Sequence, residues 1–314
     1  MEKSRPFFFK YNEFFIALIA LVCIFSIATY LGKNGWGKQS TKGIGEPSRW
    51  CEMTQPGLVR EPINTFSNLG FIIIGLLILT QIGRDKNQTT EPTNNPIIGR
   101  DLYAQFYGIA TIFLGPGSMA MHATHTNWGG WIDRVSMVCY ITFPVCYNLA
   151  RAFKWSKKTF SIVYLITNIA IATNMAMTTF FDIGFRHDFF GTFIGFWIVT
   201  ELAICFPNSP RFYMLIPALL DISLRGISHT LVLWVFLAAV PISWNNPNIK
   251  RRYLPWFWVG NTLFVVAFII WHIGDRRHAW CNPGSLVQAH AIWHILTALS
   301  AGAFYLYFRT ENTT

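Results

Sequence analysis

Apolar runs of about 20 residues follow one another along almost the whole chain, and short polar connections separate them. A helix of that length crosses the hydrocarbon core of a bilayer and satisfies its own backbone hydrogen bonds there. Only 13% of the 314 residues are charged, against about 25% in a typical soluble domain. The sequence therefore predicts an all-α polytopic membrane protein. Its apolar runs are centred on residues 14–31, 64–83, 103–122, 132–150, 159–179, 189–207, 211–243, 255–273 and 286–308.

The first apolar run follows a basic segment, as the apolar part of a signal peptide does. However, residues 14–31 form a longer apolar run than signal peptides usually have. No clear cleavage site of small residues follows them. We therefore expect an uncleaved signal-anchor helix. Because no linker or repeat divides the remaining chain, the predicted organisation is an N-terminal extension, residues 1–47, followed by one membrane domain, residues 48–314. The extension comprises a cytosolic tail, the anchor helix and a linker.

The formal net charge of +10 reflects lysines and arginines in the connections between apolar runs. Excess basic residues in short loops mark the cytosolic face, so this charge indicates orientation in a membrane and predicts no nucleic-acid partner. The N-terminus and the connections 84–102 and 151–158 are predicted to be cytosolic. The segment 32–63 and the turns 123–131 and 180–188 then lie on the lumenal or extracellular face.

Two histidines, His290 and His294, lie four residues apart at the start of the last apolar run. Residues i and i+4 share one face of a helix, so both imidazoles can converge on one metal ion. His122 ends an earlier run, and Ser118 lies four residues before it on the same face. Asp133 opens the next run after a short turn rich in Gly and Asn. These five side chains are therefore predicted to lie at one membrane depth.

The chemistry of this set is specific. Three neutral imidazoles with an open fourth position are the ligands of a hydrolytic zinc site, where zinc acidifies water and polarises a carbonyl group. A carboxylate such as Asp133 can accept a proton from that water or fix the tautomer of a ligand, and Ser118 can donate a hydrogen bond to the oxyanion. The alternative is that the histidines are packed structural residues. Among the remaining histidines, only His125, in the turn, could stand in as a metal ligand. The other histidines are expected to be structural or solvated: His187, His229, His272 and His278.

Residues 211–243 decide whether these side chains can meet. If this run crosses the membrane once, an odd number of crossings separates Asp133 from His290, and the basic connection after it lies outside, against the charge rule. Both problems disappear if the run of 33 residues enters and leaves by the same face. We expect a hairpin, or an interfacial helix paired with a tilted one, with Asp221 and Arg225 facing protein or water. The alternative is that another apolar run does not cross.

At these residues the sequence resembles the alkaline ceramidases, within the CREST superfamily of seven-helix membrane hydrolases. Three motifs in the family's order carry the resemblance: Ser118-x3-His122 with Asp133 eleven residues later, "QAHAIWHIL" in the last run, and "WCEMTQPGLVREPINTFSNLGF" in residues 50–71. The resemblance covers residues 48 to about 308. It implies a seven-helix core bundle, to which this chain adds the N-terminal transmembrane helix and the hydrophobic segment at 211–243.

The resemblance also implies a reaction. His122, His290 and His294 match the family's zinc ligands, and Ser118 and Asp133 match its catalytic residues. The implied reaction is hydrolysis of the amide bond of ceramide-type sphingolipids to a sphingoid base and a fatty acid, in an endoplasmic reticulum or Golgi membrane. Two other functions stay open. One is a related membrane hydrolase of a lipid ester or GPI-lipid, and the other is a receptor-like or scaffolding seven-helix protein with structural zinc.

Animal members of this family carry a calcium site just before the first core helix. The resemblance places its ligands here at the backbone carbonyl of Trp50 and the carboxylates of Glu52 and Glu61. Arg49 and Thr54 stand where those proteins have an Asp and an Asn, and calcium requires six to eight oxygen ligands. We therefore do not expect calcium to bind. The alternative partners of the two glutamates are the N-terminus of the helix that follows them and two arginines, Arg49 and Arg60.

Two of the six cysteines, Cys51 and Cys281, lie in polar connections, whereas the other four lie in apolar runs. The crossing count places both connections on the lumenal face, which is an oxidising compartment. We predict a disulfide bond that ties the segment before the first core helix to the 274–285 loop. The alternative is two unrelated free thiols.

Overall fold

The computed structural model describes residues 11–37, 39–40, 49–88, 95–99, 101–205 and 249–313, and this part of the chain is mostly helical. The prediction of an all-α chain is confirmed at this level, since the described strands have two residues each. The helices are α2 (Asn12–Gly32), α3 (Pro62–Ser67), α4 (Leu69–Gln88), α5 (Leu102–Thr124), α6 (Asn127–Ala152), α7 (Lys157–Phe180), α8 (Phe189–Cys205), α11 (Trp256–Ile273) and α12 (Ala289–Phe308). The strands are β1 (Ile249–Lys250) and β2 (Asn312–Thr313).

Five helical segments in the described chain are long and apolar enough to cross a membrane. They are α2, the segment Pro62–Asp85 that joins α3 to α4, α7, α11 and α12. Helices α5 and α6 have comparable length, but buried polar residues such as Thr111 and Asn148 lower their hydropathy. Polar groups at membrane depth are expected to face other helices, as these do. The described helices are therefore consistent with a membrane protein.

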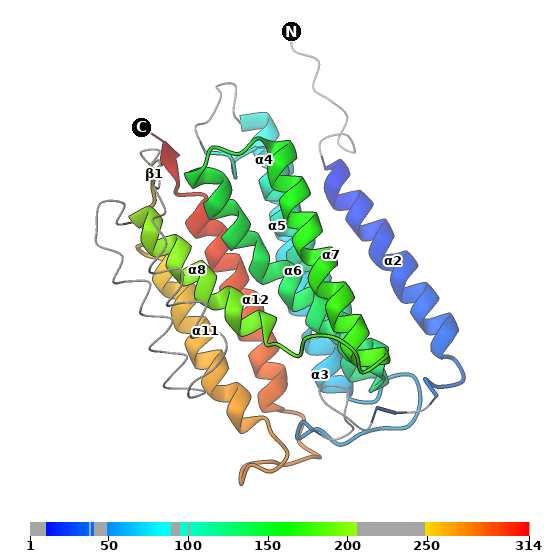
Figure 1. Ribbon diagram of the computed structural model, residues 1–314. Coiled ribbons are helices and arrows are strands. Elements are labelled where there is room, and N and C mark those ends of the chain that lie inside the picture. The colour runs from blue at the N-terminus through cyan, green and yellow to red at the C-terminus, as the bar shows by residue number, and fades with distance from the viewer. Residues whose placement is uncertain are drawn as a thin grey trace.

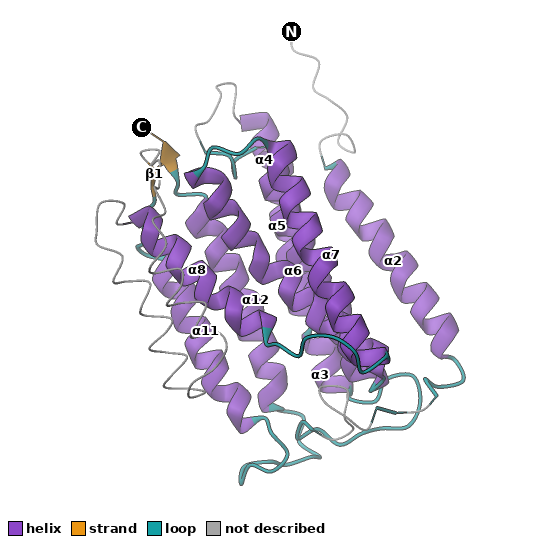
Figure 2. Ribbon diagram, in the orientation of Figure 1, coloured by secondary structure: helices purple, strands orange, loops and turns teal. Residues whose placement is uncertain are grey.

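The long helices lie side by side in one bundle, with α12 beside both α4 and α11 and with α5 between α4 and α6 (Figure 1). The turns α5–α6, α7–α8 and α11–α12 lie at one end of the bundle, together with the segment that precedes α3 (Figure 2). The α6–α7 turn and the C-terminus lie at the opposite end. The connections that the charge rule assigns to opposite membrane faces thus lie at opposite ends of the bundle.

Two glycines allow the helices that carry the candidate site to approach closely. A Cβ atom on Gly75 of α4 would lie 2.4 Å from the Ile112 side chain and 2.9 Å from the Gly108 carbonyl oxygen, both in α5. A Cβ atom on Gly117 of α5 would lie 2.5 Å from the Ser136 hydroxyl oxygen of α6. Any larger residue at either position would push these helices apart.

An aromatic core fills the half of the bundle nearer the C-terminus. Its rings come from α5, α6, α7 and α12, and many pairs meet edge to face, such as Tyr103 and Phe160 with ring centroids 4.6 Å apart. Such pairs favour a fixed geometry beyond the burial of their area. The fully buried rings of this cluster are Tyr107, Phe143, Tyr147, Phe160, Tyr307 and Phe308.

Both flanks of the segment 206–248 lie at the same end of the bundle. Glu201, in the last turn of α8, forms an ion pair with Arg251 just after β1, at 2.9 Å. β1 pairs antiparallel with β2 near the C-terminus. The chain therefore leaves α8 and returns to α11 by one face, as the predicted position of the histidines requires. The predicted hairpin itself, with Asp221 and Arg225, lies outside the described residues.

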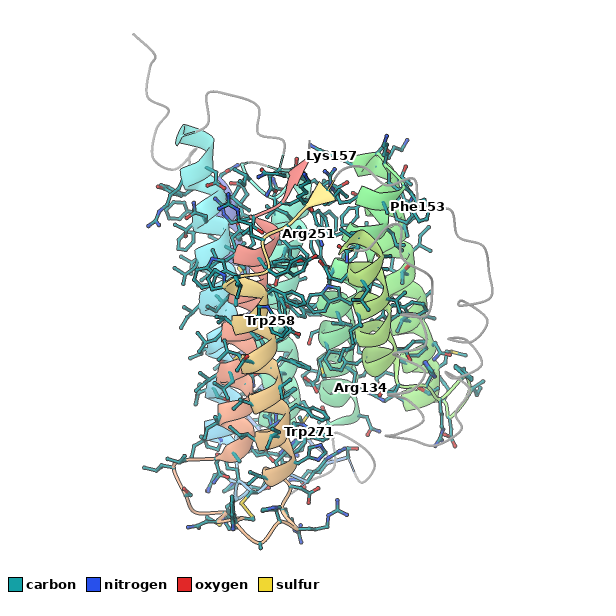
Figure 3. All side chains as sticks on the ribbon, turned by 90° about the vertical axis from the view of Figure 1, so that its left-hand side faces the viewer. Arg134, Phe153, Lys157, Arg251, Trp258 and Trp271 are labelled. Atoms are coloured by element: carbon teal, nitrogen blue, oxygen red, sulfur yellow. A yellow bond between two sulfur atoms is a disulfide. The ribbon has the colours of Figure 1, made fainter. Side chains whose placement is uncertain are left out.

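Arg251 is the centre of a buried ionic network at this end of the bundle (Figure 3). Its guanidinium group lies 2.9 Å from Glu201, 2.8 Å from Glu311 and 2.9 Å from the Asn148 amide oxygen. We expect Arg251→Met to lower the free energy of unfolding by about 3–5 kcal/mol, because the buried Glu201 carboxylate loses its cation and Glu311 loses one of its two arginine partners. Thermal unfolding in detergent measures this, with the exposed Arg252→Met as the matched control. Equal melting temperatures for the two variants would contradict it.

Candidate metal centre

Three histidines from two helices converge at the end of the bundle where α5 ends and α12 begins. One nitrogen from each of His122, His290 and His294 can be chosen so that all three lie within 4.8 Å of one another. The Nε2 atoms of His122 and His290 are 3.2 Å apart, and the centroids of His290 and His294 are 4.5 Å apart. All three side chains are buried. The group could hold a metal ion, and the prediction that these residues meet is confirmed.

The turn between α5 and α6 is set by its sequence. His125 has φ 51°, the left-handed conformation that commonly ends a helix, and its N–H donates to the Met121 carbonyl. Thr126 then caps α6, and its hydroxyl accepts a hydrogen bond from the Gly129 N–H at 3.1 Å. Because only His125 and Thr126 separate the two helices, the start of α6 lies beside the end of α5.

Ser118 and Asp133 lie on the facing sides of these two helices. The Asp133 carboxylate is buried, accepts a hydrogen bond from Ser118 and interacts electrostatically with His122. Its own backbone carbonyl accepts a hydrogen bond from Ser136 at 2.7 Å, which fixes this turn of α6. The five side chains that the sequence analysis grouped are thus close together.

Glu61 contacts both His122 of the cluster and the neighbouring His125. One carboxylate oxygen lies 2.5 Å from His122 Nδ1 and 3.0 Å from the Asn64 amide nitrogen, and the other lies 2.9 Å from His125 Nε2. Burial alone would raise the pKa of this carboxyl group, but the hydrogen bond from His122 and the close contact with His125 outweigh it and lower the pKa to about 2. Glu61 therefore carries a negative charge beside His122.

His294 and His290 are held in different ways. Nδ1 of His294 lies 2.8 Å from the Ser67 hydroxyl oxygen of α3. The ring of His290 is stacked on the ring of Trp50, with centroids 3.7 Å apart and an interplanar angle of 14°. Within the described chain, His290 Nδ1 is buried without a hydrogen-bond partner. Stacking therefore fixes the plane of His290, whereas a hydrogen bond fixes His294.

Cys51 and Cys281 form a disulfide bond, with their Cα atoms 5.4 Å apart, so the predicted pairing is confirmed. The bond joins the segment before α3 to the α11–α12 loop. The neighbouring Trp50 also forms a β-bridge with Asp275 of that loop. The disulfide thus ties the residue that stacks on His290 to the loop that leads into α12.

Loss of this disulfide should destabilise the protein. We expect Cys281→Ser to lower the free energy of unfolding by about 2–5 kcal/mol, because the bond closes a long loop and removes entropy from the unfolded chain. Thermal unfolding with and without reductant measures the change. Cys23→Ser, at an exposed position of α2, is the control and should leave the melting temperature unchanged. If reductant left the melting temperature of the wild-type protein unchanged, the disulfide bond would contribute nothing to its stability.

The sequence profile of one protein family, described as Ceramidase, matches residues 47–313. The chain belongs to the ceramidase family. Membership implies a hydrolase that acts on the amide bond of ceramide, a lipid substrate. None of the curated proteins compared with this ceramidase-family chain matches it.

The residues that match the calcium site of animal ceramidases have other partners here. Both oxygens of Glu52 accept hydrogen bonds from backbone N–H groups at the start of α3, those of Ile63 and Asn64, at 2.7 Å each. This is the helix N-terminal role that the sequence left open for Glu52. Burial raises the pKa of Glu52 in spite of these bonds. The alternative pairing of Glu61 with Arg60 is wrong, since Arg60 donates to the carbonyl oxygens of Thr124 and Gly37.

Three supporting residues of this ceramidase-family site were not predicted from the sequence. Ser67 and Asn64 were not singled out, and His125 was considered only as a stand-in metal ligand. A signal existed, because Glu61, Asn64 and Ser67 follow one another at intervals of three residues before an apolar run. Residues at that spacing lie on one face of a helix. The resemblance matches Glu61 to a calcium ligand, so its spacing to Asn64 and Ser67 does not stand out in the sequence.

Proposed function

We propose that this protein is a zinc-dependent ceramidase of the alkaline type. It hydrolyses the amide bond of ceramide-type sphingolipids and releases a sphingoid base and a fatty acid. The observation that carries the proposal is the convergence of His122, His290 and His294, all buried, at one end of the helical bundle. Membership in the ceramidase family supplies the substrate class.

The donor set fits zinc. Imidazole nitrogens suit zinc and other first-row transition metals, whereas calcium and magnesium require oxygen ligands. Three histidines leave a fourth position of a tetrahedral site open, which distinguishes a catalytic site from a closed structural one. When bound, zinc supplies a Lewis acid that polarises the amide carbonyl and acidifies water. His122, His290 and His294 would hold it.

Asp133 and Ser118 have distinct roles in this proposal. The Asp133 carboxylate accepts a proton from the attacking water and returns it to the sphingoid amine as the C–N bond breaks. The Ser118 hydroxyl orients that carboxylate or donates a hydrogen bond to the carbonyl oxygen as negative charge develops on it. Their support is the contact between the two side chains and the electrostatic interaction of Asp133 with His122.

The membrane setting belongs to the same proposal. Helices α4, α5, α6, α7, α8, α11 and α12 would form the seven-helix core of the domain in residues 48–314, and α2 would anchor the extension in residues 1–47. Ceramide remains in the bilayer, so an enzyme embedded there reaches its substrate without extracting it. We propose an endoplasmic reticulum or Golgi membrane, with the site at the lumenal end. The support is the charge of the opposite connections and the Cys51–Cys281 disulfide.

The test is the metal content and the substrate range of the purified protein. We expect one zinc per chain by mass spectrometry, and turnover of ceramide or phytoceramide that a chelator abolishes and zinc restores. His294→Ala should lose both properties, whereas His272→Ala, an exposed histidine of α11, should keep both. Stoichiometric zinc without ceramide turnover would point to a lipid ester or GPI-lipid as substrate. Zinc without hydrolysis of any of these lipids would favour the receptor-like alternative.

A further inference from the structure

The short helix α3 contacts two of the three candidate metal ligands from one face. Glu61, which precedes the helix, lies against Nδ1 of His122, and Ser67, at its end, lies against Nδ1 of His294. Asn64 lies between them and donates to Glu61 at 3.0 Å. Three positions at intervals of three residues share one helical face.

The hydrogen-bond partners of Ser67 determine the tautomer of His294. The Ser67 hydroxyl oxygen lies 2.8 Å from the Asn64 carbonyl oxygen, which only accepts hydrogen bonds, so the single hydroxyl proton is donated there. The contact between Ser67 and His294, also 2.8 Å, then requires His294 Nδ1–H to be the donor. His294 therefore leaves the lone pair of Nε2 free.

His122 reaches the same tautomer through a carboxylate. The Glu61 oxygen that lies 2.5 Å from Nδ1 of His122 also accepts a hydrogen bond from the Asn64 amide, so Nδ1–H of His122 is the donor and Nε2 faces His290. The second oxygen of Glu61 lies 2.9 Å from His125 Nε2, which restrains the carboxylate from the other side. Glu61, His122 and His125 are each no more than 1% exposed, so water does not compete for these contacts.

We propose that Glu61 and Ser67 are positioning residues that hold His122 and His294 in the metal-binding tautomer, and that His125 restrains Glu61. This inference rests on the proposed zinc function. It adds the residues that hold the zinc ligands in place. Hydrogen-bond partners of ligating histidines fix ring orientation and raise ligand basicity. Ser67 and Glu61 do so from one rigid element, whose start Glu52 holds through two backbone N–H groups.

The test is the rate of zinc loss from the purified holoprotein after addition of a chromogenic chelator. We expect Ser67→Ala and Glu61→Gln to lose zinc about 10–100 times faster than wild type, because each leaves a ligand imidazole without its partner. Ser67→Thr keeps the hydroxyl and should restore the wild-type rate. Ser300→Ala is the matched control, since this buried serine also donates to a carbonyl, that of Gly260, but lies away from the cluster.

The outcomes separate this inference from the function on which it rests. A wild-type protein that binds zinc, together with wild-type rates of zinc loss in both Ser67→Ala and Glu61→Gln, would overturn the positioning role and leave the ceramidase proposal intact. The positioning role would also be overturned if Ser67→Thr and Ser300→Ala lost zinc as fast as Ser67→Ala, because the effect would then not depend on the contact with His294. A wild-type protein without zinc would remove both proposals.

Discussion

His122→Ala is expected to abolish zinc binding and ceramide hydrolysis together. The variant would leave only His290 and His294, and two imidazoles from one helix cannot complete the three-ligand site of a hydrolytic zinc. It would also leave the buried carboxylate of Glu61 without the His122 N–H that now donates to it at 2.5 Å. Zinc content should fall to that of a protein without a site, and ceramide turnover should fall to the assay background.

Two measurements check this expectation, the zinc-to-protein ratio and the initial rate of fatty-acid release in mixed micelles. His187→Ala is the control, because His187 lies in the α7–α8 connection and contacts Thr192 instead of the cluster. A folded His122→Ala protein that still contains one zinc would remove His122 from the ligand set. His125, which lies near Glu61, would then be the residue to change next.

Much of the helical architecture could be predicted because the membrane restricts what the backbone can do. In the described part of the chain each apolar run forms a helix, as a bilayer requires, and the spacing of His290 and His294 placed both rings on one face. The short turn expected after His122 placed Asp133 at the same depth, and the structure makes this turn shorter than expected, because Asn127 and the two glycines after it already belong to α6. These are local features, so one sequence without structure was sufficient to group the five side chains.

Contacts between distant segments could not be predicted in this way. Arg251 was counted among the basic residues of a cytosolic connection, yet it is buried and paired with Glu201 and Glu311. Glu61 was assigned by resemblance to a calcium site, yet it lies between His122 and His125. In both cases the partner lies at least 50 residues away, and spacing along a chain does not report such pairs.

Asp133→Ala is expected to keep its zinc and to reduce kcat by about two orders of magnitude or more. The reason for retained zinc is that Asp133 lies beside Ser118 and is not one of the three converging groups. The reason for the lost rate is that general acid–base catalysis contributes about 10²- to 10⁴-fold, and in the proposed mechanism this carboxylate moves the proton. Ser118→Ala should show the same pattern, since its hydroxyl acts on the same groups.

The division between KM and kcat distinguishes this role from a structural one. A group that acts mainly in the transition state lowers kcat and kcat/KM together and leaves KM nearly unchanged. A change that merely loosened the contact between α5 and α6 would instead lower the melting temperature and the zinc content as well. Asp182→Asn, at an exposed position after α7 with a φ of 57° that Asn tolerates, is the control and should behave as wild type. Full kcat in Asp133→Ala would remove Asp133 from the mechanism and leave proton transfer to another group.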